Sequence, residues 1–252
     1  MTGGLPTLAV RSGTKRFGGV LALDDVNVEV FAGEVLAILG DNGAGKSTLI
    51  KCMSGVHQLD SGTIEVKGTT VHIHSPSDAR ALGIETVYQD LALFDNLGPA
   101  ANFYAGREVA GPRWLPRGMR LLHTNTMSRA TQQILDRLEV TVPDLDSAVG
   151  LMSGGQRQAV AVARATAFAS RLVILDEPTA ALGVREARRV LDLIHRLRDE
   201  GKAVAVISHA MDHVMEIADR AVVMRRGRIV GELVPSDSSR EKIVSLIVGG
   251  DR

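Results

Sequence analysis

The residues that could do chemistry lie between 40 and 48, which read Gly-Asp-Asn-Gly-Ala-Gly-Lys-Ser-Thr. This run fits the phosphate-binding pattern G-x-x-x-x-G-K-[ST], a P-loop, with Gly40, Gly45, Lys46 and Ser47 in its fixed positions. Glycine lets the backbone turn tightly, so that N–H groups approach phosphate oxygens. The positive end of the helix expected to follow favours the same anion. The run therefore predicts a site for a nucleoside triphosphate.

Individual side chains of this loop have separate expected roles. Lys46 reaches the β and γ phosphates, Ser47 binds Mg²⁺, and Thr48 adds a hydroxyl contact to a phosphate. The apolar run at residues 35–39 ends at the loop, as a buried strand should. The residues expected to contact nucleotide are Gly40, Asp41, Asn42, Gly43, Ala44, Gly45, Lys46, Ser47 and Thr48.

Two carboxylates end another apolar run, Leu-Val-Ile-Leu-Asp-Glu at residues 172–177. Acids at the carboxyl end of a buried strand lie where α/β folds bind ligands. Asp176 is expected to hold Mg²⁺ through its hydration shell, and Glu177 to polarise the attacking water as a general base. Two acids that cap a strand in a solvated turn are the alternative, which the P-loop disfavours.

A third candidate is Ser153-Gly154-Gly155-Gln156, which precedes a helical run. Ser153 can cap that helix, and its N-terminus would suit a phosphate. By composition alone, however, these residues fit an ordinary capped helix equally well.

The elements that must position these residues follow from hydrophobic pattern. Runs of β-forming residues predict strands in the first part of the chain at 8–10, 26–30, 63–67 and 83–88. After residue 172, strands at 172–175, 203–207, 221–224 and 229–233 alternate with helices at 185–200 and 211–218. This alternation predicts a mostly parallel sheet that is covered on both faces. A mainly helical insertion is expected over 92–165, with a helix at 126–138 and little apolar periodicity in 98–122.

Composition narrows the class of protein. The 252 residues carry 29 basic and 29 acidic side chains, so nothing suggests a nucleic-acid-binding surface. The single cysteine, Cys52, excludes an internal disulfide and suits a reducing compartment. The first residues lack a secretory signal, and no apolar stretch approaches the roughly 20 residues that span a bilayer. We expect a soluble protein that reaches a membrane only through a partner.

The order of these motifs resembles the ATP-binding subunits of ABC transporters along nearly the whole chain. The series runs from the P-loop through Gln89, Met-Ser-Gly-Gly-Gln at 152–156 and Asp176-Glu177 to His209. The resemblance implies the α/β fold of a P-loop NTPase of the ABC ATPase type. Its mostly parallel core sheet is flanked by helices and joined by an N-terminal antiparallel β-subdomain and a helical insertion. One ABC domain over 1–252 is expected, with core and β-subdomain from 1–91 and 166–252 and the helical subdomain from 92–165.

The family also implies how the site works. Two subunits form a head-to-tail homodimer when ATP is bound, and Ser153, Gly155 and Gln156 of one face the γ-phosphate held by Lys46 of the other. The expected catalytic residues are Lys46, Gln89, Glu177 and His209. Those expected around Mg²⁺ are Ser47, Gln89 and Asp176. Phe17 is expected to stack on adenine.

Two departures from the family pattern concern Met152, where leucine is common, and Gly183, where the D-loop usually has aspartate. The first conserves volume, and the second could alter communication between the two ATP sites. Residues 85–93 and 176–186 look like the bacterial monosaccharide-uptake class, in its fructose-type, single-domain form, where glycine replaces that aspartate. This implies ATP-driven sugar import through a transmembrane permease, at the cytoplasmic face of the plasma membrane, with an extracytoplasmic sugar-binding protein delivering the sugar.

Other functions stay open at this point. The chain could serve an amino-acid importer or an exporter, act as a soluble ABC ATPase on ribosomes or DNA, or be a non-hydrolysing regulatory module. The loop 98–122 is either a solvated basic loop or part of a permease-docking surface; it holds Trp114, Arg107, Arg113, Arg117 and Arg120. His72 and His74 have a spacing that suits a metal, but no neighbouring Cys or carboxylate completes a site.

Overall fold

A computed structural model describes residues 4–112, 114, 121–180 and 182–249. Its central sheet has the strand order β12-β11-β3-β10-β9-β6, and neighbouring strands are parallel except for the antiparallel pair β11–β12. The strands are β3 (Val35–Gly40), β6 (Ile84–Val87), β9 (Leu172–Asp176), β10 (Ala203–Ile207), β11 (Arg220–Arg225) and β12 (Arg228–Leu233). Every residue of β3, β9 and β10 is buried. The predicted mostly parallel sheet is confirmed.

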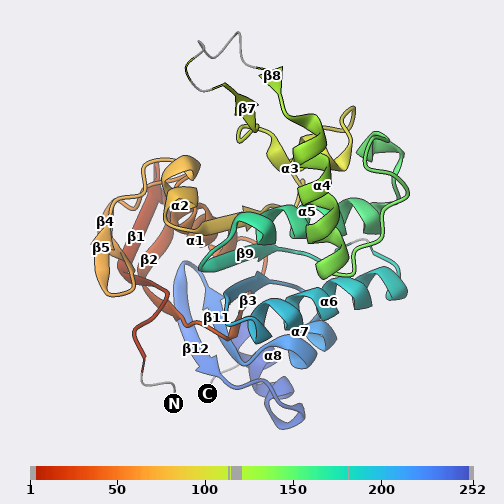
Figure 1. Cartoon of the computed structure of the whole chain (residues 1–252). Coiled ribbons are helices and arrows are strands. Elements are labelled where there is room, and N and C mark those ends of the chain that lie inside the picture. Colours follow the sequence, from red (N-terminus) through yellow and green to blue (C-terminus); the bar gives the residue numbers. More distant parts are fainter. Residues whose placement is uncertain (1–3, 113, 115–120, 181, 250–252) are drawn as a thin grey trace.

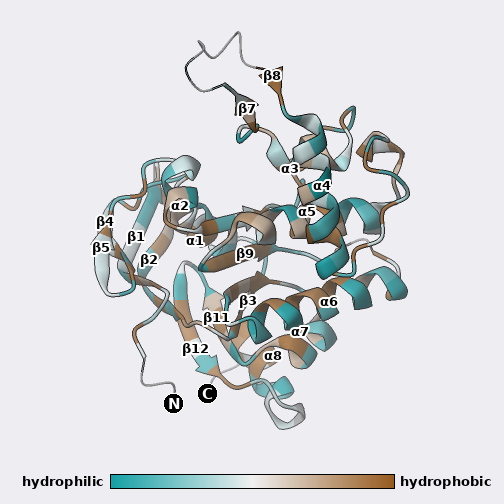
Figure 2. Cartoon of the chain, in the orientation of Figure 1, coloured by the Kyte–Doolittle hydropathy of each residue, from teal (hydrophilic) through white to brown (hydrophobic). Residues whose placement is uncertain are grey.

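Helices cover both faces of this sheet (Figure 1). They are α1 (Lys46–Met53), α2 (Pro76–Ala81), α5 (Gly154–Phe168), α6 (Val184–Asp199), α7 (Met211–Ile217) and α8 (Arg240–Val248). Alternate residues of a strand point to opposite faces, so Ile174 packs with the α1 side of the core while Val173 and Leu175 pack with α5 and α6. Figure 2 shows the core strands β3 and β9 as strongly hydrophobic, whereas α6 carries both hydrophobic and hydrophilic residues.

An antiparallel sheet of order β2-β1-β4-β5 packs beside α1. It consists of β1 (Leu8–Phe17), β2 (Val20–Val30), β4 (Ser61–Val66) and β5 (Thr69–Val71). Both β1 and β2 are longer than the runs predicted at 8–10 and 26–30. The pairing register shifts after Val10, and Ser12 and Asp25 have positive φ, so irregularities interrupt the two-residue alternation that reveals a strand. The expected N-terminal antiparallel sheet is confirmed.

The region between β6 and β9 is helical, as predicted. It holds α3 (Pro99–Tyr104), α4 (Thr124–Arg137), the 3₁₀ turn η2 (Val149–Leu151), α5, and the short pair β7 (Ala110–Gly111) and β8 (Leu121–Leu122). The helix expected at 126–138 is α4. Because α5 runs to Phe168, one continuous helix crosses the boundary drawn at 165/166, and the division into subdomains stays a prediction.

Several short elements were not predicted from the pattern: α2, α3, α8, β5 and the 3₁₀ turn η3 (Asp237–Ser239). Pro76 and Pro99 each occupy the first turn of a helix, a start signal that could have revealed α2 and α3. No helix of the described residues has both the length and the apolar character that crossing a bilayer requires.

Candidate functional site

The P-loop backbone is shaped by glycines that no other residue could replace without cost. Gly40, Gly43 and Gly45 have φ of 147°, 77° and 106°, which side chains rarely allow. A Cβ on Gly40 would lie 2.2 Å from the Met224 carbonyl oxygen, and one on Gly45 would lie 2.6 Å from that of Ala22. Gly45 also starts α1, whose N-terminus has no side-chain cap from the described residues. The first N–H groups of α1 therefore stay available to an anionic ligand.

Lys46 is folded back on this loop. Its side chain is buried, and Nζ donates hydrogen bonds to the carbonyl oxygens of Gly40 (2.7 Å) and Asp41 (2.9 Å). Burial lowers the pKa of Lys46, and the nearby charges of Glu177, Asp176 and Asp41 oppose that shift. The ammonium is thus held among carbonyls and carboxylates, within reach of any phosphate that the loop binds.

Glu177 is positioned by an unusual backbone. It follows β9 with a left-handed φ of 53°, and its N–H donates to the Ile207 carbonyl at 2.9 Å. Its Oε2 accepts a hydrogen bond from the His209 N–H (3.3 Å), and Oε1 lies 3.4 Å from His209 Nε2. Oε1 is buried and forms no hydrogen bond with the described residues. A non-glycine residue held in such a conformation is common at functional sites.

Burial is the largest influence on both carboxylates. It raises the pKa of Asp176, against the effects of Lys46, Lys51 and His209. It also raises the pKa of Glu177, which the charge and N–H of His209 partly offset. Both acids lie at the end of β9, where the sheet meets the P-loop, and their partial desolvation makes them sensitive to a bound cation.

These residues share one open pocket of about 360 Å³. Gln89, Asp176, Glu177 and His209 line it together with the P-loop from Asn42 to Thr48. The structure therefore brings together motifs that are far apart in the sequence. It also adds residues that sequence reasoning missed, namely Val20, Leu21, Ala22, Ile207 and Arg226. Arg226 has a positive φ in the turn between β11 and β12; the Arg-Arg-Gly run between two predicted strands was its only signal.

Ser153, Gly155 and Gln156 are absent from the lining of this pocket as far as the structure describes it. They line a different pocket, between α5 and α6. Ser153 begins α5 in a capping box: its Oγ accepts from the Gln156 N–H (3.2 Å), while Gln156 Oε1 accepts from the Ser153 N–H (3.0 Å). Because this Oγ acts as an acceptor, its own hydrogen remains for donation to a ligand.

Phe17, at the end of β1, is 43% exposed and does not line the P-loop pocket in the described structure. Its ring contacts His57 edge-on at a centroid distance of 5.1 Å, and Lys15 Nζ lies 5.5 Å from the ring centre. Stacking on adenine stays a prediction.

The structure also places the remaining residues that the sequence singled out, namely Cys52, His72, His74 and Gly183. Burial raises the pKa of Cys52 to about 11, so its thiol is a poor nucleophile. The rings of His72 and His74 stack at 6.0 Å, and no group of three or more His, Cys, Asp or Glu among the described residues could hold a metal ion. Gly183 precedes α6 as its N-cap, without a capping side chain from the described residues.

The basic loop 98–122 is only partly described, since Arg113, Arg117 and Arg120 lie outside the described residues. Trp114 is 81% exposed. Arg107, however, is not a solvated cation: it forms an ion pair with Glu85 at 2.6 Å and lies over the Phe168 ring.

The sheet order and the P-loop pocket define a P-loop ATPase with an inserted helical region. Comparison with known proteins sharpens this class: the model of the family described as ABC transporter matches residues 23–180. The chain belongs to the ABC transporter family, as one of its ATP-hydrolysing cassettes.

Two of the relatives match this chain along nearly their whole lengths. The chain is 45% identical over 245 residues to the fructose import ATP-binding protein FrcA of Rhizobium meliloti, covering 97% of this chain and 94% of that protein. It is 45% identical over 240 residues to the xylose/arabinose import ATP-binding protein XylG of Sulfolobus acidocaldarius, covering 95% and 93%. A crystal structure of a nucleotide-free ATP-binding cassette from an ABC transporter superposes with a TM-score of 0.80 at 26% identity, covering 96% of this chain and 98% of that one. The predicted fold is confirmed.

Proposed function

We propose that this chain hydrolyses ATP to drive import of a monosaccharide through a separate transmembrane permease. Both relatives named above are sugar import ATP-binding proteins, and they match this chain over almost their full lengths. The two relatives are named for different sugars, although each is 45% identical to this chain. This supports the view that the ATP-binding subunit does not select the sugar, and that the permease and an extracytoplasmic sugar-binding protein do. The chain then works as a peripheral subunit at the cytoplasmic face of the membrane.

The observation that carries this proposal is the position of Glu177 and His209 at the rim of the P-loop pocket. Glu177 presents a buried carboxylate oxygen without a hydrogen-bond partner among the described residues, so it is suited to accept a proton from the attacking water. His209 lies beside it, where it can orient that water. Lys46 has the charge and reach to bind the β and γ phosphates.

The site also fits Mg²⁺. Ser47, Gln89 and Asp176 line the same pocket and supply hydroxyl, amide and carboxylate oxygens, the ligand types that Mg²⁺ prefers. Bound with ATP, the ion would neutralise phosphate charge as the bond to the γ-phosphate breaks. The protein's own part is to hold these oxygens, Lys46 and Glu177 in one pocket.

A second copy of the chain completes the ATP site on the side that the P-loop pocket leaves open. Ser153 is exposed, lies outside its own P-loop pocket, and its hydroxyl accepts from the Gln156 N–H but donates to no group among the described residues. In a head-to-tail dimer with twofold symmetry, Ser153, Gly155 and Gln156 of each subunit complete the ATP site of the other. ATP closes this dimer and hydrolysis reopens it, which moves the docked permease.

The test compares Glu177→Gln with Glu200→Gln, a control at the end of α6. Glu177→Gln should slow Mg²⁺-dependent phosphate release by about 10²–10⁴-fold, the usual contribution of a general base, while ATP binding persists. The control should hydrolyse ATP like the unmodified chain. Wild-type rates in Glu177→Gln would show that Glu177 is not the base.

The identity of the binding partner distinguishes an importer subunit from a soluble ABC ATPase. Affinity purification from native membranes should recover a protein with several transmembrane helices. Recovery of ribosomal RNA or DNA in its place would favour the soluble class.

A further inference from the structure

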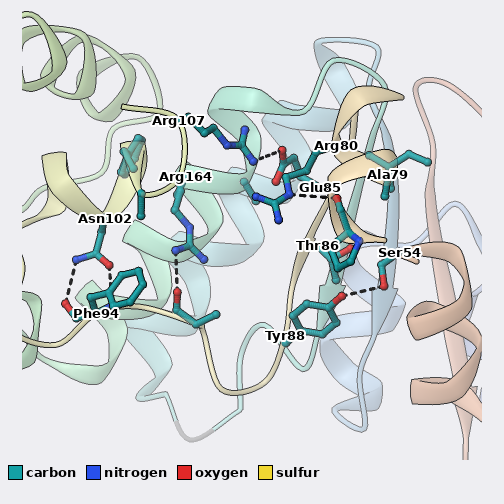
Figure 3. A pocket seen from close by; sticks show the side chains of 16 residues that line it. Ser54, Ala79, Arg80, Glu85, Thr86, Tyr88, Phe94, Asn102, Arg107 and Arg164 are labelled. Carbon is teal, nitrogen blue, oxygen red and sulfur yellow. Dashed lines mark hydrogen bonds and ion pairs between the residues drawn. The ribbon is translucent and has the colours of Figure 1, made fainter. Parts of the chain in front are cut away.

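Helix α5 carries two features that contact different parts of the molecule. Ser153 caps its N-terminus, and Arg164 lies about three turns further along, at a distance of about 16 Å. The guanidinium of Arg164 crosses to the segment that follows Gln89: Nη1 donates to the Ala92 carbonyl at 2.8 Å, and Nη2 donates to the Leu91 carbonyl at 3.0 Å. Figure 3 shows this arginine reaching across the pocket. One side chain thus joins the helix of Ser153 to the turn of Gln89.

The turn that Arg164 holds is strained. Leu91 and Ala92 have left-handed φ of 59° and 46°, a conformation that is strained for a residue other than glycine. The Leu91 N–H donates to Tyr88 (2.9 Å) and the Ala92 N–H to Asp90 (2.7 Å), which closes a tight turn around Gln89. The two carbonyls consequently point to a single guanidinium, whose planar fork suits two parallel acceptors. Within the described residues, Arg164 is the donor to both of these carbonyls, and no backbone N–H outside the helices and strands donates to either.

A second arginine of the same pocket binds α5 differently. Arg107 lies 4.2 Å over the Phe168 ring at the end of α5 and forms the 2.6 Å ion pair with Glu85 on β6. Arg107 therefore stabilises the packing of α5 on the sheet, but its hydrogen bonds do not reach Leu91 or Ala92 in the described structure. Within one pocket, Arg164 therefore binds the turn after Gln89, whereas Arg107 stabilises the packing of α5 (Figure 3).

We propose that Arg164 is a positioning residue that couples Gln89 in one ATP site to Ser153 in the other. The proposal rests on the roles assigned to Gln89 and Ser153 under the proposed function. When Gln89 shifts toward bound Mg²⁺ and nucleotide, the Leu91–Ala92 carbonyls move with it, and α5 follows through the guanidinium. Because α5 is one continuous helix, the displacement reaches Ser153 and orients it for the neighbouring subunit.

The experiment uses the full chain and the variant Arg164→Met, which keeps an unbranched side chain but removes every donor. Two quantities are measured. The first is the affinity for ADP, which depends on the P-loop pocket of one subunit alone, and the second is the dependence of hydrolysis on ATP concentration. We expect ADP affinity to change less than about twofold. The half-saturating ATP concentration should rise at least about fivefold, the lower end for coupling between two sites, and the Hill coefficient should fall toward one.

Two further variants separate coupling from folding. Arg107→Met removes a guanidinium from the same pocket and should lower the melting temperature while leaving the Hill coefficient and half-saturation as in the wild type. Arg164→Lys should restore part of the coupling, since a single ammonium can bridge two carbonyls: Lys202 Nζ does so with Thr166 (3.0 Å) and Ala169 (2.8 Å). If Arg164→Met does not fold, Arg164→Lys carries the test, with an intermediate shift expected.

Three results would overturn the coupling role of Arg164. They are wild-type half-saturation and cooperativity in the Arg164 variants, a loss confined to maximal rate in proportion to folded protein, and an equal shift in Arg107→Met. A wild-type chain that does not hydrolyse ATP would instead refute the proposed function, and the coupling would fall with it; a wild-type chain that hydrolyses ATP without cooperativity would refute the coupling alone. The wild-type curve therefore distinguishes the two failures.

Discussion

Two glycine-rich turns, each at the start of a helix, are built in opposite ways. In the P-loop, Gly40 and Gly45 have positive φ and backbone carbonyls close against them, so the turn is fixed by the sheet around it. In the turn that starts α5, a Cβ added to Gly154 would meet no atom of the described residues within 4 Å, and Ser153 and Gln156 bond to each other's backbone. The first turn is held by the core and the second by its own side chains.

This difference agrees with the roles proposed for them. A turn that wraps phosphates within one subunit needs its N–H groups fixed in advance, because reorganisation on binding costs free energy. A turn that completes a neighbour's site must be exposed and must satisfy its own helix end until the neighbour arrives. The following predictions test that contrast, beginning with the largest expected effect.

Lys46→Met should have the largest effect on activity. It removes the ammonium that is poised at the P-loop, and hydrolysis should fall about 10²–10³-fold, as when one preorganised electrostatic group is lost. The measurement is Mg²⁺-dependent phosphate release. Lys242→Met, at an exposed position of α8 that does not line the P-loop pocket in the described structure, serves as control and should retain activity. Comparable rates in the two variants would contradict the role of Lys46.

Gly40→Ala and Gly154→Ala should differ sharply in stability. At position 40 the added Cβ meets the Met224 carbonyl at 2.2 Å with φ at 147°, so we expect a loss of at least about 2 kcal/mol in the free energy of unfolding. At position 154 there is space, and alanine should be neutral or stabilise by up to about 1 kcal/mol. Chemical denaturation measures both, and equal losses would show that the two turns are equally constrained.

Ser153→Ala should have a small effect on stability but a selective one on function. Losing the cap costs about 1 kcal/mol, and ADP affinity should not change because Ser153 does not line its own P-loop pocket in the described structure. Hydrolysis, measured as Mg²⁺-dependent phosphate release, should nevertheless fall.

Ser75→Ala is the matched control for that substitution, since Ser75 caps α2 through the Asp78 N–H at 3.3 Å. It should cost similar stability and leave hydrolysis unchanged. An equal loss of hydrolysis in both variants would mean that Ser153 acts only as a helix cap.

Sequence reasoning worked best where the physical signal is local. The strands of the core were predicted because buried parallel strands are continuous apolar runs, and the P-loop because its glycines and lysine have a fixed spacing. It failed where the signal is short or interrupted: β1 and β2 are broken by irregular pairing, and α2, α3 and α8 span only six to nine residues. Helices of that length depend on tertiary packing more than on propensity.

The contacts of Arg107 and Arg164 could not be predicted from the sequence either. From the sequence, Arg107 belonged to a basic loop of open role, and Arg164 had no assigned role. Their partners, Glu85 and the carbonyls of Leu91 and Ala92, lie 22, 73 and 72 positions away. Spacing along the chain cannot reveal such pairs, because they form only when α5 packs beside β6.

The sequence by itself determined which groups were proposed to bind phosphate and metal, since backbone freedom at glycine, charge at Lys46 and the acids at the end of β9 are properties of residue type and spacing. The tertiary structure alone decided which groups meet: that Glu177 lies against His209, that Ser153 lies outside its own P-loop pocket, and that Arg164 holds the turn of Gln89. The reason is physical. Covalent spacing sets local conformation, whereas contacts between distant residues depend on how the sheet and its helices bury their apolar faces.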